Sequence, residues 1–177
     1  MNLANTSGQT ADEKAKSFSE MVRTYQERLY WHIRKMVLVH DDANDVLQNT
    51  FMKAWKGLDN FRGDSQISTW LYRIATNETL SFLSQKKARM MNSFEDVEEL
   101  MLQNLQADTY FEGDEVQLKL QKAIITLPEK QRLVFNMRFY DEMPYEEMSK
   151  ILDTSVGALK ASYHHAARKV EDFLIKE

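Results

Sequence analysis

The sequence predicts an all-α protein made of two small helical domains joined by an acidic linker. Its 177 residues include only five Gly and two Pro, too few turn residues for a protein of many β-strands. Apolar residues recur at steps of three and four over most of the chain, which is the spacing of one face of an α-helix. The segment 91–116 carries eight acidic residues and no Lys or Arg, and it separates two segments of nearly balanced charge.

The N-terminal domain is predicted to be a bundle of three to four helices behind a polar tail. Residues 1–15 are small and polar without apolar periodicity, so we expect a flexible tail. Residues 16–90 carry three apolar stripes at helical spacing. Asp41 and Asp42 suit the first turn of the second helix, because carboxylates stabilise the positive end of a helix dipole. Side chains predicted to face inward include Met21, Leu29, Ile33 and Met36, then Val46, Phe51, Ala54 and Trp55, then Ile67, Trp70, Leu71 and Ile74.

Residues 91–116 are predicted to form the acidic linker. Gly113 interrupts them, and a short helix is expected over residues 95–105, where Val97 and Leu100 can share a face with later apolar residues.

Residues 117–177 are predicted to form a four-helix domain that contains a helix-turn-helix. Pro128 and Pro144 fit the opening turns of the second and third helices, since the first turn of a helix leaves its N–H groups unpaired. Asp153 and Thr154 are expected to make a tight turn, after which Ser155 caps the fourth helix. Two helices separated by about three residues, the second long and capped, are typical of a helix-turn-helix.

The composition excludes several classes of protein. The absence of cysteine excludes disulfides, thiolate metal sites and a cysteine nucleophile. No apolar run approaches the roughly 20 residues that span a bilayer, and no secretory signal is apparent, so we expect no membrane insertion and a cytoplasmic location. The four histidines lack metal-binding spacing and are expected to be exposed or to contact phosphates. Without a phosphate loop or catalytic constellation, we expect neither an enzyme nor a bound metal or cofactor.

Several motifs occur in an order that resembles one known family. They are DVLQNTFMKAW at residues 45–55, FRGDS at 61–65, TWLYRIATN at 69–77, LPEKQR at 127–132, YEEM at 145–148 and TSVG at 154–157. These segments are similar to the extracytoplasmic-function (group IV) sigma factors of the sigma-70 family, and the resemblance covers nearly the whole chain after residue 17. It implies a sigma region 2-like domain, a sigma region 4-like domain and three partners: core RNA polymerase, promoter DNA and an anti-sigma factor. It also implies that the linker passes near the nucleic acid inside polymerase.

The resemblance also implies three sets of contact residues. The polymerase-clamp helix supplies Asp45, Gln48, Asn49 and Lys53. The element that melts the promoter and reads its minus-ten element supplies Phe61, Arg62, Gly63, Asp64, Ser65, Arg73, Asn77, Lys86 and Lys87. The helix that reads the minus-thirty-five element supplies Ser155, Gly157, Ala158, Lys160, Ala161, Ser162, His164, His165 and Arg168.

The chemistry of these residues fits those roles. Promoter opening needs a pocket for an unstacked base and cations along the strand, which the 61–65 loop and the basic residues after it can provide, whereas Trp70 is expected in the core. Small side chains on a recognition helix allow close approach to a major groove. The family pattern has arginines near positions 162, 165 and 167, where this sequence has Ser162, His165 and Ala167. Its duplex contacts are therefore expected to be weak or unusually selective.

Two other functions fit the same pattern. One is a helix-turn-helix regulator that binds duplex DNA without polymerase, and the other is a helical protein-interaction module. A formal net charge of -4 argues against tight DNA binding by the free chain, because phosphate affinity comes from Lys and Arg that displace counterions. A sigma factor should direct transcription only with polymerase, whereas a regulator should bind its operator alone.

Overall fold

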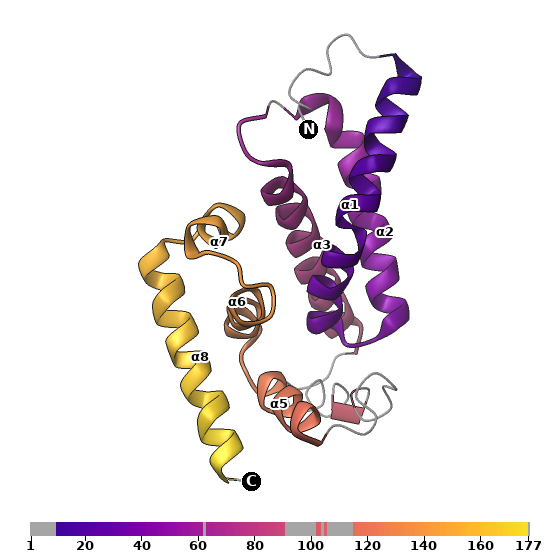
Figure 1. Cartoon of the computed structure of the whole chain (residues 1–177). Helices are drawn as coiled ribbons and strands as arrows, with labels where there is room; N and C mark the ends of the chain where they lie inside the picture. The colour runs from indigo at the N-terminus through magenta and orange to yellow at the C-terminus, as the bar shows by residue number, and fades with distance from the viewer. Residues whose placement is uncertain (1–9, 62, 91–101, 104, 106–114, 177) are drawn as a thin grey trace.

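The chain folds into two groups of helices that lie against each other (Figure 1). The computed structural model describes residues 10–61, 63–90, 102–103, 105 and 115–176. Within those residues the regular elements are helices and no strand is present, which confirms the all-α prediction. No helix of the described residues is both long enough and apolar enough to cross a membrane.

Helix α1 (Ala11–Val37) begins five residues before the predicted boundary, so residues 11–15 are helical rather than part of a tail. The reason is a capping box. The Thr10 hydroxyl accepts from the Glu13 amide, and the Glu13 carboxylate accepts from the Thr10 amide. Residues 1–9 of the predicted tail lie outside the described residues. The helix ends at Leu38, whose φ of 65° turns the chain toward the next helix.

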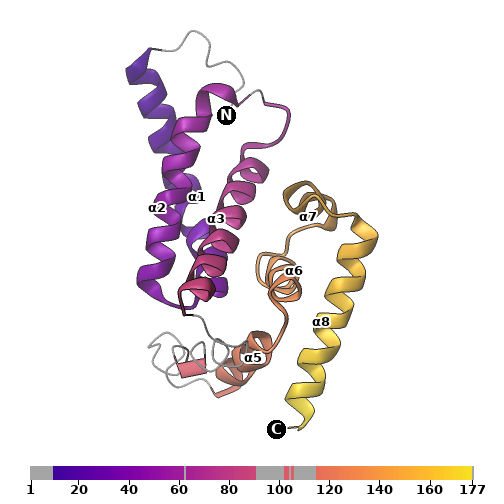
Figure 2. The same cartoon turned by 180° about the vertical axis from the view of Figure 1, so that it is seen from behind.

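Helices α1, α2 (His40–Gly57) and α3 (Ile67–Met90) form the N-terminal bundle, with the short 3-10 helix η1 (Leu58–Asn60) after α2 (Figure 2). Asp41 and Asp42 lie in the first turn of α2, as predicted. The buried core of the bundle includes Met21, Leu29, Ile33, Met36, Val46, Ala54, Leu71 and Ala75.

The C-terminal domain consists of α5 (Glu115–Ile125), α6 (Glu129–Phe139), α7 (Tyr145–Leu152) and α8 (Val156–Lys176). Helix α5 therefore includes the last two residues of the predicted linker, and most of the linker helix predicted over 95–105 lies outside the described residues. Pro128 and Pro144 are the N-caps of α6 and α7. Asp153 turns the chain with a φ of 49°, and the Ser155 hydroxyl accepts from the Ala158 amide, as a cap should. Helices α7 and α8 form the predicted helix-turn-helix.

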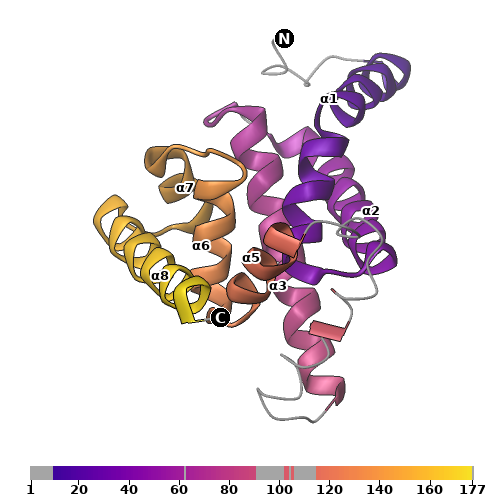
Figure 3. The same cartoon turned by 60° about the horizontal axis from the view of Figure 1, so that its bottom comes forward.

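The two domains share one hydrophobic core. Helix α6 packs on α1, and α7 packs on α3 (Figure 3). Buried apolar side chains of the N-terminal bundle are continuous with those of the C-terminal domain, which include Leu133, Met137, Met148, Ile151 and Leu159. A second contact joins Leu38, Ile125 and Leu105, a described residue of the linker that is almost fully buried. Apolar burial of this kind stabilises the packed arrangement of the free chain.

A cluster of buried and partly buried polar side chains, here called the interdomain cluster, consists of His32, Lys35, Thr76, Asn136 and Asp141. Nδ1 of His32 lies 2.8 Å from a carboxylate oxygen of Asp141, and Nε2 lies 3.0 Å from the Thr76 hydroxyl. The Lys35 ammonium donates to the other Asp141 oxygen over 2.7 Å, and the Asn136 amide donates to the Lys35 carbonyl. His32 is only 1% exposed, so the expectation of an exposed or phosphate-contacting histidine is wrong at this position.

The interdomain cluster sets the charge of Asp141. Burial alone would raise the pKa of its carboxyl, but the hydrogen bond and charge of His32 together with Lys35 outweigh burial and lower that pKa below its ordinary value. Burial also raises the pKa of the nearby Tyr72 hydroxyl to about 12, with the Asp141 charge adding to the effect. At neutral pH the Tyr72 hydroxyl is therefore protonated and the Asp141 carboxylate is ionised.

Replacing Asp141 by Asn should destabilise the protein in a pH-dependent way. A lowered folded-state pKa means that the ionised carboxylate stabilises the fold above the unfolded pKa of about 3.9, and that this contribution is lost as pH falls through the folded value. At pH 7 the variant should lose about 2 kcal/mol of unfolding free energy, measured by urea denaturation. The difference should shrink below about pH 4. Glu142→Gln at the exposed neighbouring residue is the control. If Asp141→Asn lost as much unfolding free energy below about pH 4 as at pH 7, the account would be contradicted.

Candidate protein and nucleic-acid interfaces

One exposed face of α2 carries the predicted polymerase contacts. Asp45, Gln48 and Asn49 are all exposed, and their spacing of three and four residues places them side by side on the helix. Lys53 is exposed one turn further on, but its ammonium pairs with the carboxylate of Glu78 on α3. The structure therefore brings three of the four residues together as one open polar surface and gives the fourth an internal partner.

An apolar pocket of about 410 Å³ adjoins this polar surface. Its lining residues are Phe18, Gln48, Phe51, Met52, Trp55 and Lys56. Met52 is 51% exposed and Trp55 is 37% exposed, so the prediction that Trp55 faces inward is wrong. Trp55 instead packs edge-on against Phe18 of α1, with the Lys14 ammonium 4.6 Å from the centre of its ring. Large apolar side chains beside exposed polar ones are typical of a protein-binding surface.

The loop between η1 and α3 was predicted to form the base pocket, but none of its described residues lines the second pocket, which it adjoins only through the contact of Phe61 with Trp70. Gly63 has a φ of 75°, a conformation that favours glycine, and the exposed Asp64 and Ser65 follow it. Phe61 packs on Trp70 with 5.0 Å between ring centres. Arg62 lies outside the described residues. The loop is thus held by an aromatic contact at its first residue and turns at its glycine.

The second pocket lies between α2 and α3 and has a volume of about 420 Å³. It is lined by Lys53, Gly57, Asn60, Trp70, Ile74, Asn77 and Glu78. Trp70 is only partly buried, so it packs on the core with part of its ring and also forms a wall of the pocket. A Cβ atom at Gly57 would lie 3.2 Å from this ring, which shows how closely the two helices approach.

The predicted minus-ten residues on α3 divide into separate groups. Asn77 lines the second pocket, whereas Arg73 is exposed but is not among its lining residues. The Lys86 ammonium pairs with Asp42 of α2 at 2.6 Å, and Lys87 is exposed near the end of the helix. Sequence reasoning missed Asn60 and Glu78. Glu78 shares the helical face of Trp70, Ile74 and Asn77, and that spacing was the available signal.

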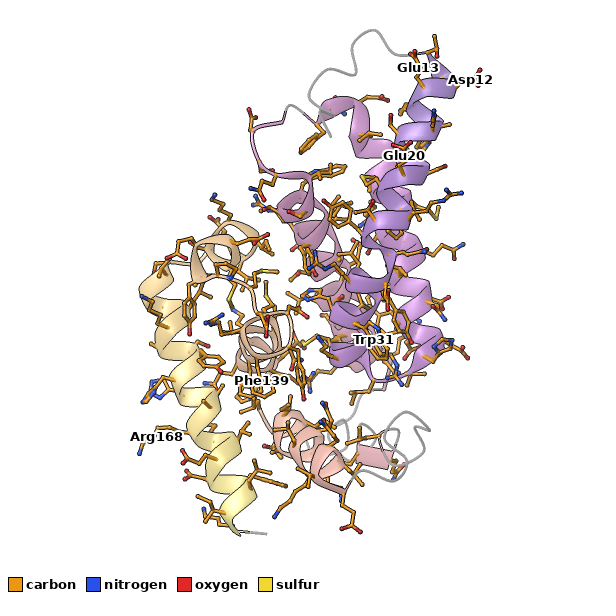
Figure 4. All side chains as sticks on the ribbon, viewed as in Figure 1. Asp12, Glu13, Glu20, Trp31, Phe139 and Arg168 are labelled. Carbon is orange, nitrogen blue, oxygen red and sulfur yellow. The ribbon has the colours of Figure 1, made fainter. Side chains whose placement is uncertain are left out.

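The outer face of α8 is open, as predicted. The exposed residues on this helix include Gly157, Ala158, Lys160, Ala161, His164, His165 and Arg168, while Ser162 is half-buried. Figure 4 shows Arg168 on the side of α8 that points away from α6. Tyr163 faces inward and stacks on Phe135 of α6 with 5.6 Å between ring centres. Among the described residues there is no group of His, Cys, Asp or Glu that could hold a metal ion.

Comparisons with known proteins match both domains to one family. The model of Sigma-70 region 2 matches residues 21–89, and the model of Sigma-70, region 4 matches residues 117–170. The ECF RNA polymerase sigma-E factor of Escherichia coli K12 is 30% identical over 174 residues, covering 93% of this chain and 88% of that protein. The RNA polymerase sigma-H factor of Pseudomonas aeruginosa is also 30% identical, covering 94% of this chain and 89% of that protein.

Two solved structures share the fold at 22% identity. The sigma factor RpoE of Bartonella quintana, in complex with the anti-sigma factor NepR, has a TM-score of 0.69 and covers 90% of this chain and 97% of its own. CnrH, in complex with the cytosolic domain of CnrY, has a TM-score of 0.68 and covers 92% of this chain and 90% of its own. The order of the two regions, the helix-turn-helix and the relatives agree, and the chain belongs to the extracytoplasmic-function group of the sigma-70 family.

Proposed function

We propose that this chain is an alternative sigma factor that binds core RNA polymerase, directs it to particular promoters and opens the DNA there. The observation that carries the proposal is that both sigma regions occur in order on one chain and that most of the described contact residues predicted in each are exposed. The chain itself supplies no catalytic group in this proposal, since polymerase performs the chemistry. Its place of action is the cytoplasm, where polymerase and DNA meet.

Polymerase binding is assigned to α2. Asp45, Gln48 and Asn49 offer a carboxylate and two amides, and the adjacent Met52 and Trp55 offer apolar area. Interfaces commonly combine an apolar centre with a polar rim, and an exposed carboxylate favours a basic partner surface. A basic coiled coil on polymerase, as the family resemblance implies, fits this combination.

Promoter opening is assigned to the second pocket and the loop before α3. Holding a base outside the stack costs a few kcal/mol, so the protein must offer a cavity with an apolar wall and hydrogen-bonding groups. Trp70 and Ile74 supply the wall, while Asn60 and Asn77 supply amides. Arg73 and Lys87 are exposed elsewhere on α3 and can attract the strand.

Recognition of the minus-thirty-five element is assigned to the outer face of α8. The small residues Gly157, Ala158 and Ala161 allow a close approach to the groove, and His164 and Arg168 can donate to base edges or phosphates. Replacing both His164 and Arg168 by Ala should lower transcription from promoters that depend on this element by about tenfold.

The readout for that double variant is sequencing of transcripts from promoters randomised in the upstream element. The control is Lys176→Ala, which removes a cation from the far end of the same helix. If the double variant kept the sequence preference of the unmodified chain, the assigned face would be incorrect.

The two domains must separate during this function. Minus-ten and minus-thirty-five elements lie about 25 base pairs apart, or roughly 85 Å along B-DNA. A compact chain of 177 residues has a radius of gyration of about 16 Å and so a diameter of about 40 Å, which is too small for two packed domains to reach both elements of straight DNA. Polymerase would hold the domains apart. An anti-sigma factor, as in the complex of RpoE with NepR, would instead hold the chain away from polymerase.

The experiment that tests the proposal is transcription reconstituted from purified core polymerase, the chain and a library of randomised promoters. A sigma factor should give transcripts from defined start sites whose templates share two sequence elements. Core polymerase without the chain is the control. If adding the chain produced no new start sites, the proposal would be wrong.

A further inference from the structure

The second pocket contains a carboxylate, which is an unusual group in a nucleic-acid site. Glu78 lies on the same face of α3 as Trp70, Ile74 and Asn77, and its side chain is 14% exposed. DNA phosphates repel a carboxylate, so this residue does not serve general attraction to the backbone. Its position beside Asn77 in the wall of the pocket suits it to contact whatever enters.

Glu78 also forms an ion pair with a lysine of α2. The Lys53 ammonium from α2 pairs with the Glu78 carboxylate, and both residues line the pocket. The pair leaves the lysine with little net attraction for phosphate, and it holds the carboxylate in place on the pocket wall. An ionised carboxylate has two oxygens with about four acceptor positions, so one lysine does not saturate it.

The remaining acceptor positions restrict the bases that fit. A carboxylate can only accept hydrogen bonds, and glutamate is a known acceptor for the exocyclic amine of cytosine. Cytosine, adenine and guanine each carry such an amine. Thymine has no exocyclic amine, and its single ring N–H, at N3, lies between two carbonyl oxygens that repel the carboxylate. The low exposure of Glu78, 14%, strengthens this discrimination, because unpaired polar groups cost more away from water.

We propose that Glu78 makes this pocket select an unstacked base that carries an exocyclic amine and reject thymine. The inference rests on the proposed function, since it names the class of base that the promoter-opening site takes. Asn77 donates or accepts at the neighbouring atom of the base, and Trp70 lies against it. Lys53 acts as a positioning residue that holds the Glu78 carboxylate toward the pocket.

The test uses polymerase assembled with the full chain and a promoter library randomised over the minus-ten element. Open complexes are captured and their non-template strands sequenced. With the unmodified chain, one position should exclude thymine by about tenfold relative to the bases that carry an amine. With Glu78→Gln, whose amide can donate as well as accept, the exclusion at that position should fall below about threefold. Glu27→Gln on the exposed face of α1 is the charge-matched control and should keep the exclusion.

A second measurement needs no variant, and so survives any misfolding of Glu78→Gln. At the selected position, the favoured base is replaced by an analogue that lacks only its exocyclic amine. Capture by the unmodified chain should fall about tenfold. Absence of any open complex would overturn the proposed function. Open complexes that form with no thymine exclusion, with an exclusion unchanged by Glu78→Gln, or with equal capture of the analogue would overturn this inference alone.

Discussion

Cross-linking the two domains is expected to abolish promoter-directed transcription. The Thr69 hydroxyl of α3 donates to the Glu147 carboxylate of α7, so cysteines at these two positions can be joined by a short bis-maleimide. The unmodified chain contains no cysteine, so the bis-maleimide reacts only with the two introduced cysteines. Because joined domains cannot reach two promoter elements roughly 85 Å apart, transcription should fall on the order of a hundredfold. If the bis-maleimide contains a disulfide, a reducing agent cleaves it, separates the domains and should restore transcription.

The control for this experiment joins two helices of one domain. The Lys169 ammonium of α8 donates to the Gln131 amide oxygen of α6, and cysteines at these positions place the same linker inside the C-terminal domain. That cross-link should leave transcription nearly unchanged. If the chain cross-linked between Thr69→Cys and Glu147→Cys worked as well before reduction as after it, domain separation would not be needed.

A second large loss is expected when the polar surface of α2 is changed. The double variant Asp45→Arg with Gln48→Ala reverses a charge and removes an amide from the exposed face. Affinity for core polymerase should fall by at least about tenfold, because like charges at an interface cost several kcal/mol. The measurement is fluorescence anisotropy of the labelled chain titrated with core polymerase.

Stability separates this effect from misfolding. Both side chains are exposed, so the urea midpoint of the double variant should match that of the unmodified chain. Glu27→Arg places a matched charge reversal on α1 and should keep the affinity. Unchanged polymerase affinity in the double variant would remove α2 as the anchor.

Local patterns in the sequence were sufficient for the helices and most of their ends. Periodicity predicted the buried faces of α1 and α3, and Pro128, Pro144 and Ser155 lie where helix-start chemistry places them. The early start of α1 was missed because its first residues lack an apolar stripe. The capping box of Thr10 and Glu13 was the signal that marks it.

Contacts between distant residues could not be predicted in this way. The separation of His32 and Asp141 along the chain is 109 residues, and a single polar pair leaves no periodic trace. The ion pairs of Lys53 with Glu78 and of Lys86 with Asp42 also join residues far apart in the sequence. Both lysines were predicted to contact a partner molecule, and both have a partner within the chain instead. Trp55 was placed inward by periodicity, although a helix at the edge of a three-helix bundle leaves part of its apolar stripe uncovered.

The candidate surfaces were predicted by resemblance more than by physics. The exposure of Gly157, His164 and Arg168 follows from helical spacing, but nothing in that spacing distinguishes DNA from solvent. Asn77 was predicted along the path of the strand and lines the second pocket, whereas its neighbour Glu78 in the same lining was not predicted. A pocket depends on the approach of two helices, which a single stripe does not encode.

The most direct test is whether the chain recognises promoter DNA alone or only with polymerase. Fluorescent promoter duplexes from the selected library are titrated with the chain, with core polymerase, and with both. We expect sequence-specific binding only in the mixture, because the free chain has a net charge of -4 and its packed domains cannot reach both elements. Tight binding to the same sequences by the chain alone, unchanged by polymerase, would identify a duplex-binding regulator and contradict a sigma factor.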